Sequence, residues 1–431
     1  MPDDVIFALA SGAGRAAVAV LRLSGPGTGA VVQALAGRLP PPRHASLRRL
    51  RHKGELLDEA LVLWFPGPAS YTGEDSAEFH LHGGPAVLAG VAEALVSTGA
   101  RPAEPGEFTR RAFVNGKLDL TAAEGIADLI AAETAGQRRQ ALRQAGGALA
   151  TLYEDWTARL TALLARQEAF IEFEEEDLPS GLDDAVAIAA TTLRTEIATH
   201  LADGGRGERL REGLHIAILG APNAGKSSLL NALVGREAAI VSARAGTTRD
   251  VVEARLDLAG IPVTLADTAG LRDATDEIEA EGIRRARRRA EQADLLLLLF
   301  AADQPPDAET LAWHRPNALV VHSKSDLGPV PSDGLPVSAH TGEGLPALRA
   351  RLEAEALSRA GTTAETLLTR PRHRAALQDA LAWLDTLPSA PLPELRAEAL
   401  RAALRAIGRI TGRVGVEAVL DVVFGEFCIG K

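Results

Sequence analysis

Cysteine, lysine and long hydrophobic runs are scarce in this chain. Cys428 is the only cysteine, so no internal disulfide can form, which is typical of a reducing compartment. The apolar run at 295–300 is far too short to span a bilayer and favours a buried parallel strand. The first four residues are acidic where a signal peptide would be basic. We therefore expect a cytoplasmic protein without a membrane segment.

Length and charge narrow the class of protein further. A chain of 431 residues exceeds what one hydrophobic core usually supports, so we expect two to four domains. Its 46% hydrophobic and 24% charged residues are typical of a soluble globular protein. The formal net charge of -11 argues against broad adhesion to nucleic acid or anionic membrane. Any contact with RNA should therefore be confined to a local basic face.

A phosphate-binding pattern stands in the middle of the chain. The apolar run 214–219 precedes Gly220-Ala-Pro-Asn-Ala-Gly-Lys-Ser-Ser228, and helical apolar spacing follows. A strand, a glycine-rich turn and a helix are the setting in which this motif cradles phosphates on backbone N–H groups. We expect Lys226 to reach the β- and γ-phosphates and Ser227 to supply a hydroxyl to Mg²⁺. A glycine turn without a ligand is the weaker alternative, because lysine and serine both fall in register.

Further motifs follow in the order that a GTPase requires. Gly246-Thr-Thr-Arg-Asp250 offers Thr248 to the Mg²⁺ shell from a switch segment. Asp267-Thr-Ala-Gly270 offers a carboxylate to the metal through water and a glycine N–H to the γ-phosphate. In Lys324-Ser-Asp326 the aspartate can accept two hydrogen bonds from guanine, and a backbone N–H at Ser338-Ala339 could meet the guanine oxygen. Together these motifs favour a GTPase over an ATP-using kinase.

Two regions of different pattern precede this domain. The first alternates strand-like runs at 18–23, 60–65 and 77–82 with a helical run, which predicts an α+β domain. Residues 105–120, rich in glycine and polar side chains, look equally like a functional loop and a domain junction.

From 121 to about 211 the spacing of apolar residues predicts helices. Acidic residues at 172–177 interrupt the pattern, and we expect a solvated face there rather than a catalytic carboxylate pair. Gly204-Gly-Arg-Gly207 predicts a flexible junction before the P-loop domain.

Short motifs outside the P-loop series are spread over the whole chain. They are Leu21-Arg-Leu-Ser-Gly25, Ser70-Tyr-Thr-Gly-Glu-Asp75, Pro105-Gly-Glu-Phe-Thr109, Asn115-Gly-Lys117, Asp267-Thr-Ala-Gly-Leu-Arg272 and the closing Phe427-Cys-Ile-Gly-Lys431. With these motifs the chain as a whole resembles the MnmE (TrmE) family of tRNA modification GTPases. The resemblance implies a multidomain α/β protein with an α+β folate-binding and dimerisation domain at 1–118. It also implies a discontinuous helical domain at 119–210 and 361–431, with a Ras-like P-loop GTPase domain inserted at 211–360.

The resemblance also implies an activity and partners. Members of the family hydrolyse GTP with Mg²⁺ and K⁺ rather than an arginine finger, and they act as homodimers. With an FAD-containing MnmG-type protein, in a heterotetramer or larger complex, they modify carbon five of the wobble uridine of certain tRNAs. The added aminomethyl or carboxymethylaminomethyl group draws on a one-carbon unit carried by tetrahydrofolate.

The family's functional positions fall on this sequence as follows. Folate contacts are expected at Arg22, Glu78, Lys117 and Lys431, and Glu279 is expected to orient the attacking water beside the catalytic Lys226 and Asn223. Mg²⁺ ligands are Ser227 and Thr248, and K⁺ ligands are Asn223, Ser242, Arg244 and Thr247. The expected GTP contacts are Asn223, Ala224, Gly225, Lys226, Ser227, Ser228, Ser242, Ala243, Arg244, Ala245, Gly246, Thr247, Thr248, Asp267, Thr268, Ala269, Gly270, Ser323, Lys324, Asp326, Ser338 and Ala339. Without the resemblance, Glu279 reads as an exposed helix carboxylate.

The distribution of lysine agrees with two of these assignments. Lysine and arginine together number 46, yet lysine occurs only at 53, 117, 226, 324 and 431. A compact ammonium is the simplest reason to keep lysine where arginine is otherwise used. Lys117 and Lys431 therefore point to a second site apart from the nucleotide, whereas we assign Lys53 to a solvated loop. Cys428 is read as a buried helix residue rather than a reactive thiol.

One departure from the family pattern concerns guanine recognition. The usual Asn-Lys-x-Asp motif reads Ser323-Lys-Ser-Asp326, so the asparagine amide that ties the base to the P-loop is missing. Asp326 remains, and guanine preference should survive. A regulatory GTPase in ribosome assembly would share this domain but usually carries a basic RNA-binding appendage. A scaffold that binds GTP without hydrolysis would share the P-loop and differ at Glu279 or the K⁺ ligands.

Overall fold

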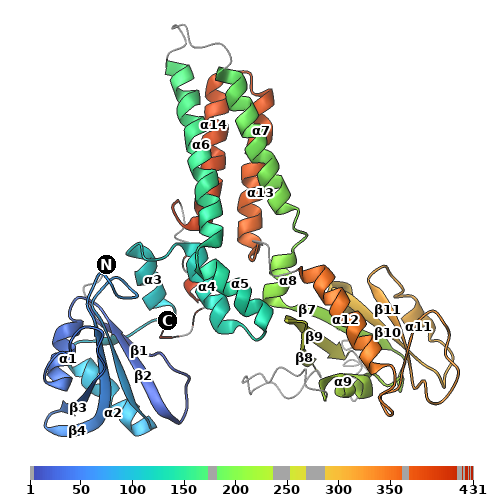
Figure 1. Cartoon of the computed structure of the whole chain (residues 1–431), viewed down its shortest axis with the longest axis horizontal. Coiled ribbons are helices and arrows are strands. Elements are labelled where there is room, and N and C mark those ends of the chain that lie inside the picture. The colour runs from blue at the N-terminus through green and yellow to red at the C-terminus, as the bar shows by residue number, and fades with distance from the viewer. Residues whose placement is uncertain are drawn as a thin grey trace, which may run out of the picture. The chain divides into compact units, whose positions relative to one another are not determined.

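The computed structural model describes residues 4–172, 182–235, 253–267, 287–361, 368–414, 420, 423–425, 427 and 429–430 (Figure 1). By its internal contacts the chain divides into two compact units. The first comprises residues 1–127, 144–157 and 407–431, and the second comprises residues 128–143 and 158–406. No helix in the described part of the chain is long and apolar enough to cross a membrane.

The first unit contains a six-stranded sheet in the order β3-β4-β5-β2-β1-β6. β1 and β6 pair in parallel, and the other neighbours pair antiparallel. Alternate side chains of β4 are buried, so one face of the sheet packs against helices and the other stays open. The strands are β1 (Ile6–Leu9), β2 (Ala16–Ser24), β3 (Ser46–His52), β4 (Glu55–Phe65), β5 (Ser76–Gly83) and β6 (Arg101–Pro102), and the covering helices are α1 (Thr28–Ala36) and α2 (Pro85–Ser97).

The segment 105–120 is neither a long loop nor a bare junction. It forms α3 (Glu107–Val114) and the start of α4 (Leu120–Ala131), because Gly106 takes the left-handed conformation that lets a helix begin there. Leu120 of α4 packs with Phe424 and Phe427 from the end of the chain. The last residues of the sequence therefore belong to the same unit as the first.

The second unit contains another six-stranded sheet, in the order β12-β11-β10-β7-β9-β8. All neighbours are parallel except the antiparallel β8–β9 hairpin. The strand predicted at 295–300 is confirmed as β10 (Leu295–Ala301), with every residue buried. The other elements are β7 (Leu214–Gly220), α9 (Lys226–Val234), β8 (Glu253–Leu258), β9 (Ile261–Asp267), α11 (Ala308–Leu311), β11 (Ala318–Ser323), β12 (Leu335–Val337) and α12 (Leu345–Ala360).

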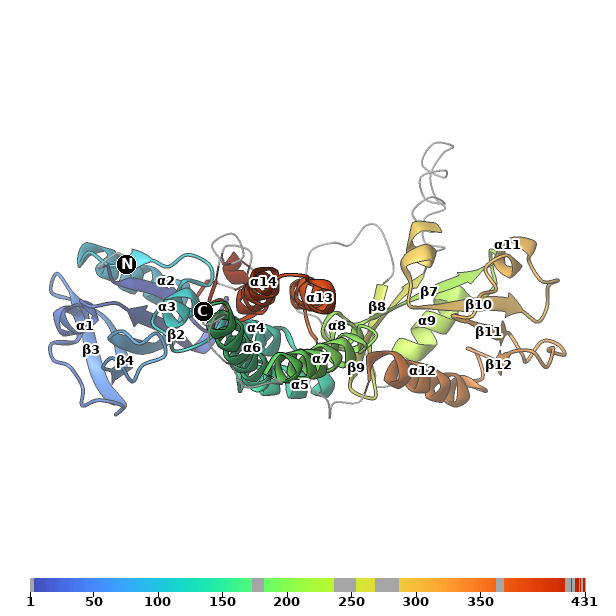
Figure 2. The same ribbon diagram turned by 90° about the horizontal axis from the view of Figure 1, so that it is seen from above.

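Four long helices from two distant stretches of sequence run side by side (Figures 1 and 2). Ion pairs join them: Arg159 to Glu196 at 2.6 Å and Arg401 to Glu168 at 2.5 Å. Helices on both sides of the P-loop domain in sequence thus form one discontinuous helical domain, as the fold prediction states. They are α6 (Ala148–Glu172), α7 (Leu182–Leu201), α13 (Pro371–Thr386) and α14 (Pro393–Thr411), with α5 (Ala135–Ala145) and the short η1 (Leu387–Ser389) nearby in sequence.

The glycine-rich segment before β7 is more ordered than predicted. Gly205, at φ +75°, begins helix α8 (Arg206–Glu212), and Gly213, at φ +93°, follows its end. Left-handed glycines are common at such helix boundaries. The prediction of a flexible junction at 204–207 was therefore wrong, since its glycines mark helix ends.

Candidate functional site

The loop between β7 and α9 has the backbone of a phosphate cradle. Asn223 and Gly225 take left-handed conformations, with φ of 63° and 89°, and α9 begins at Lys226 without a side-chain cap. A helix N-terminus that follows a glycine-rich loop is suited to binding a phosphate. A Cβ on Gly220 would lie 2.6 Å from the carbonyl oxygen of Leu299, so only glycine fits where the loop leaves the sheet.

Lys226 lies inside this loop rather than at the surface. Its side chain is buried, and the ammonium donates to the carbonyl oxygens of Gly220 at 2.7 Å and Ala221 at 2.8 Å. These contacts hold the ammonium against the loop's own backbone. The role of Lys226 as a compact charge beside the β- and γ-phosphates stays a prediction.

The parallel strands bring the other predicted elements to the same edge of the sheet. Asp267 ends β9, Ser323 ends β11, and Ser338 follows β12. β9 pairs in parallel with β7 on one side, and β10, β11 and β12 follow in parallel on the other. The carboxyl ends of these strands therefore lie at the same edge of the sheet as the P-loop. Ligands of such sheets bind at this edge. The structure thus gathers motifs that lie more than a hundred residues apart.

Ser323, which replaces the usual asparagine, contacts the P-loop directly. Its hydroxyl oxygen lies 2.5 Å from the carbonyl oxygen of Ala224 and 3.3 Å from that of Phe300. The serine is buried, and its hydroxyl has a single proton to donate. The shorter distance indicates that this proton is donated to the carbonyl of Ala224. Ser323 thus ties the end of β11 to the P-loop, and the expected loss of the asparagine amide's contacts to the base stays a prediction.

The base-recognition residues that follow are also held in place. Lys324, at φ +54°, pairs its ammonium with Asp303 at 2.9 Å. The hydroxyl of Ser338 donates to the carboxylate of Asp326 and holds the pKa of that exposed carboxyl below its ordinary value. Asp326 therefore stays ionised and available to accept hydrogen bonds. Ala339 follows Ser338 on the same loop.

Several predicted residues lie outside the described part of the chain. They include the switch segment with its K⁺ and Mg²⁺ ligands, the residue expected to orient water, and the terminal lysine. For Asp267 the backbone is described as the end of β9 and the side chain is not. The residues outside are Ser242, Ala243, Arg244, Ala245, Gly246, Thr247, Thr248, Thr268, Ala269, Gly270, Glu279, Cys428 and Lys431.

In the first unit, two of the predicted folate residues face each other across the sheet. Arg22 on β2 is in register with Glu78 on β5, and its Nε and Nη2 lie 3.1 and 3.0 Å from Oε1 of that carboxylate. His80, two residues along the same face, lies 3.3 Å from the other carboxylate oxygen. Both partners of the Arg22–Glu78 pair are about three-quarters buried, at 24% and 20% exposed. This is an organised polar site on an otherwise open sheet face.

A loop connects this pair to the third predicted residue. The guanidinium of Arg22 lies 5.6 Å from the ring centre of Tyr71, whose hydroxyl pairs with Thr109 at 2.9 Å. Burial raises the pKa of Tyr71, so its hydroxyl stays protonated. Lys117 lies beside Gly73 of the same loop and donates to the carbonyl of Pro68 at 3.0 Å. Tyr71 was not singled out from the sequence, although its motif was.

The closing segment of the chain reaches this neighbourhood. A Cβ on Gly430 would lie 2.2 Å from the carbonyl oxygen of Leu9, so the chain end lies against β1. Leu9 is paired with Leu21, the residue before Arg22. The residue that precedes Lys431 is therefore close in the fold to Arg22.

A buried arginine explains two further motifs of the N-terminal region. Arg111 is only 4% exposed and pairs with three carboxylates: Asp4 at 2.8 Å, Glu107 at 3.0 Å and Glu74 at 3.2 Å. Arg101 adds a pair with Glu107 at 2.6 Å. This network fastens α3 and the loop 70–75 to the start of the chain, so these motif residues support the site rather than line it.

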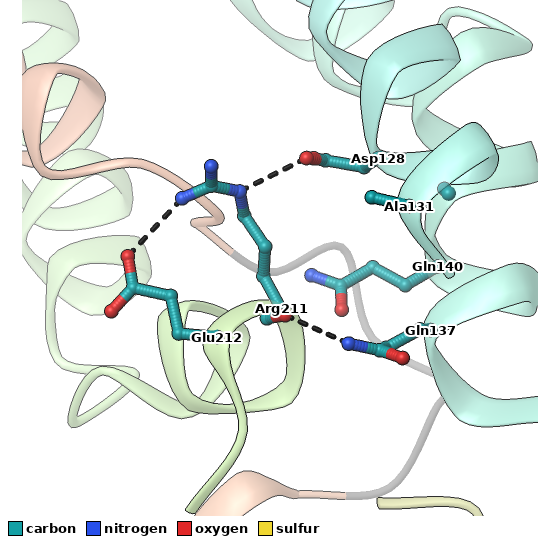
Figure 3. A pocket seen from close by; sticks show the side chains of 7 residues that line it. Asp128, Ala131, Gln137, Gln140, Arg211 and Glu212 are labelled. Carbon is teal, nitrogen blue, oxygen red and sulfur yellow. Dashed lines mark hydrogen bonds and ion pairs between the residues drawn. The ribbon is translucent and has the colours of Figure 1, made fainter. Parts of the chain in front are cut away.

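A cavity of about 140 Å³ lies in the second unit, where α4 and α5 meet α8 (Figure 3). Arg211 pairs with Asp128 at 2.9 Å and with Glu212 at 3.1 Å, while Gln137 donates to its carbonyl at 2.8 Å. Arg370 approaches the same Asp128 at 2.8 Å. These contacts fix the helices to the entrance of β7. We read the cavity as part of a structural junction.

The same corner holds the turn of the β8–β9 hairpin. The carbonyl of Gly260 accepts from the Thr134 hydroxyl at 2.7 Å and from the Gly136 N–H at 3.1 Å. Glu133 pairs with Arg255 of β8 at 2.9 Å. A Cβ on Gly136 would lie 2.2 Å from the Gly260 oxygen. These contacts anchor the turn of the β8–β9 hairpin to the start of α5.

A P-loop with a buried lysine inside it, and loops predicted to recognise guanine on the same edge of a mainly parallel sheet, define the sheet domain of the second unit as a P-loop GTPase domain. The family description "MnmE helical domain" matches residues 120–428, and "GTP-binding protein TrmE N-terminus" matches residues 5–117. The tRNA modification GTPase MnmE of Gluconacetobacter diazotrophicus is 58% identical over 99% of this chain and 98% of that protein. Its counterpart in Granulibacter bethesdensis is 56% identical over the full length of both.

The chain therefore belongs to the MnmE family of tRNA modification GTPases. Among solved structures, the G domain of the T. maritima FeoB iron transporter matches 33% of this chain and 98% of its own, with 24% identity and a TM-score of 0.26. That similarity is too low to bear on function.

Proposed function

We propose that this GTPase couples K⁺-dependent GTP hydrolysis to modification of carbon five of the wobble uridine in certain tRNAs. In this proposal an FAD-containing MnmG-type protein is its partner, and a tetrahydrofolate derivative supplies the one-carbon unit. The observation that carries the proposal is the presence of two separate organised sites in a chain of this family. One is the phosphate cradle at Lys226, and the other is the Arg22–Glu78 pair.

The nucleotide site is proposed to hold GTP with Mg²⁺ at Ser227 and Thr248 and K⁺ at Asn223, Ser242, Arg244 and Thr247. Support comes from the left-handed backbone at Asn223, which places its side chain on the loop that surrounds the phosphates. A monovalent cation there would neutralise the charge that develops between the β- and γ-phosphates, as an arginine finger does elsewhere. Glu279 is proposed to orient the attacking water.

The folate site is proposed to involve Arg22, Glu78, Lys117 and Lys431. A reduced folate presents a pterin with amide and amino donors, an aromatic ring and a carboxylate tail, so it needs an acceptor, an apolar surface and cations. Glu78 supplies the acceptor, Tyr71 a ring, and Arg22 and Lys117 the cations. The proximity of Gly430 to β1 supports the inclusion of Lys431.

A homodimer through the first unit is part of the proposal. The open face of its sheet carries exposed apolar side chains, with Val18 53%, Leu47 63% and Leu61 43% exposed. An apolar face of this kind usually meets a partner, and a second copy of the chain is the simplest one.

The deciding experiment is reconstitution with tRNA, GTP, a methylene- or formyl-tetrahydrofolate and an MnmG-type protein. Mass spectrometry of the wobble nucleoside should show the modified uridine only when all components and K⁺ are present. GTP hydrolysis without any change in the nucleoside would contradict the proposal. It would then favour the alternatives of a regulatory GTPase or a GTP-binding scaffold.

A further inference from the structure

One stretch of the first unit differs sharply in charge from the rest of the chain. Residues 5–54 contain no aspartate or glutamate, although the chain has 57 acidic residues and a net charge of -11. The same stretch carries eight arginines and lysines. Five of these basic residues lie exposed between the end of α1 and the turn after β3: Arg38, Arg43, Arg49, Arg51 and Lys53. We call these five residues the basic edge.

The fold places most of this charge along the margin of the sheet. β3 is the terminal strand and pairs only with β4 within the described residues, so its outer side has no neighbouring strand. Arg49 and Arg51 project from β3, with a bulge between Leu50 and Arg51. Lys53, at φ +48°, and Gly54, at φ +85°, form the tight turn into β4. The ammonium of Lys53 is thereby held at the tip of a hairpin.

Nearby carboxylates offset little of this charge. Glu59 pairs with Arg49 at 2.6 Å, and both side chains are exposed, so water screens the pair. The other acids on β4 are Glu55, which is exposed after the turn and whose side chain makes no hydrogen bond or ion pair among the described residues, and Asp58. Asp58 is buried and accepts hydrogen bonds from the imidazole and N–H of His82 at 2.7 and 2.9 Å. Arg51 contacts only a backbone carbonyl, that of Gly54 at 3.2 Å, among the hydrogen bonds of the described chain. Its charge and that of Lys53 therefore face solvent.

We propose that the basic edge binds the phosphate backbone of the tRNA. This inference rests on the proposed function, because tRNA is the polyanion on which a protein of this family acts. A locally cationic strip on an acidic protein directs a polyanion to one place, since the remaining surface repels it. Contacts to phosphates carry no base information, so the strip would position tRNA without selecting its sequence.

The competing explanation is that these charges protect an unpaired edge strand from pairing with another chain. Arginine and lysine on edge strands often serve that purpose. The two explanations separate under charge reversal. Glutamate at Arg51 and Lys53 leaves the edge charged and protected, but it repels phosphate.

The test compares the parent chain with the double variant Arg51→Glu and Lys53→Glu. Binding of a fluorescent tRNA transcript is measured by anisotropy at several salt concentrations. We expect the variant to bind about tenfold or more weakly, with a salt slope reduced by about one to two, since each lost phosphate contact removes about 0.7–0.9 from the slope. GTP hydrolysis and size-exclusion behaviour should match the parent.

A matched control carries the same change in net charge elsewhere. Arg138→Glu on α5 with Arg405→Glu on α14 alters two exposed arginines far away in sequence. Equal loss of binding in this control would overturn the proposal, because net charge alone would then explain the effect. Unchanged tRNA affinity in the Arg51/Lys53 variant would overturn it as well.

The outcome for the parent separates this inference from the proposed function. A parent that modifies tRNA while the Arg51/Lys53 variant binds and modifies it equally well contradicts only the basic edge. A parent that neither binds nor modifies tRNA contradicts both. Unchanged tRNA affinity together with an unchanged elution volume would assign these charges to edge protection, which charges of either sign provide.

Discussion

The hydroxyl of Ser323 lies 2.5 Å from the carbonyl oxygen of Ala224, so the guanine-recognition strand is tied directly to the P-loop. The tie joins the end of β11 to the loop after β7, two strands that are separated by β10 in the sheet. It therefore couples the loop predicted to bind the base to the loop predicted to bind the phosphates.

Replacing Ser323 with alanine should weaken GTP binding by about 1 kcal/mol, the usual net value of one hydrogen bond, or roughly fivefold in Kd. Ser325→Ala is the matched control, because the hydroxyl of Ser325 is buried without a hydrogen-bond partner in the described structure. Titration with a fluorescent GTP analogue measures both. Equal dissociation constants for the parent and Ser323→Ala would show that the contact does not preorganise the site. Ser323→Asn restores the usual motif and should tighten GTP binding by less than about 1 kcal/mol, because the serine already makes one hydrogen bond to the P-loop.

GTP turnover should be faster in KCl than in NaCl at the same ionic strength. The reason is that Asn223 stands where a K⁺ ligand is required and an arginine finger is not evident from the sequence. Asn223→Gly should remove the difference between the salts, because glycine accepts the φ of 63° without strain and lacks the side-chain oxygen. Steady-state phosphate release measures this. Identical rates in the two salts for the parent would refute the K⁺ assignment.

Gly136→Ala should destabilise the anchorage of the β8–β9 hairpin. The added Cβ would fall 2.2 Å from the Gly260 oxygen, so the hairpin turn or the start of α5 has to shift. Overpacking of this kind costs about 1–3 kcal/mol, which a lower urea midpoint would report. Gly12→Ala is the control, since its Cβ would meet nothing within 4 Å. A urea midpoint equal to that of the control would show that the hairpin turn and the start of α5 shift without a cost in stability.

Acid should destabilise the first unit through Asp4 and Glu107. Burial raises the pKa of each carboxyl, but Arg101 and Arg111 outweigh it and leave both values below the ordinary ones. A carboxyl with a lower pKa in the folded chain stabilises it fully above the unfolded pKa, and this contribution disappears as pH falls through the folded value. We therefore expect stability to drop below about pH 4. Asp4→Asn should flatten this dependence in thermal melts, whereas Glu93→Gln, exposed on α2, should leave it unchanged.

Lys431→Arg should abolish or strongly reduce folate binding and tRNA modification while GTP affinity stays nearly unchanged. A guanidinium keeps the charge but replaces a compact ammonium with a planar group. Lys53→Arg is the control and should leave folate binding intact. Isothermal titration with 5-formyltetrahydrofolate measures both variants. Normal binding by Lys431→Arg would mean that the residue is only a terminal charge.

The sequence alone determined the P-loop and the buried strand at 295–300, whereas the discontinuous helical domain was predicted through resemblance to a family. The P-loop and the strand each depend on local pattern: Lys226 and Ser227 fall in register with the glycines, and a run of six apolar residues can only be buried. The sequence also placed Arg22 and Glu78 in one site, but only through resemblance to a family, because nothing local links two residues on different strands.

Only the tertiary structure decided what depends on approach between distant backbones. From the sequence, Ser323 indicates only that the usual asparagine is missing. The structure shows that its hydroxyl lies 2.5 Å from the carbonyl oxygen of Ala224, so β11 is hydrogen-bonded to the P-loop. The glycines at 204–207 predict a flexible linker, whereas in the structure Gly205 stands at the start of helix α8. The basic edge is likewise invisible as a surface until the sheet order places β3 at its margin. The local sequence pattern predicts the secondary structure that a segment prefers by itself. Tertiary packing determines which backbone carbonyls and charged groups from distant segments it contacts.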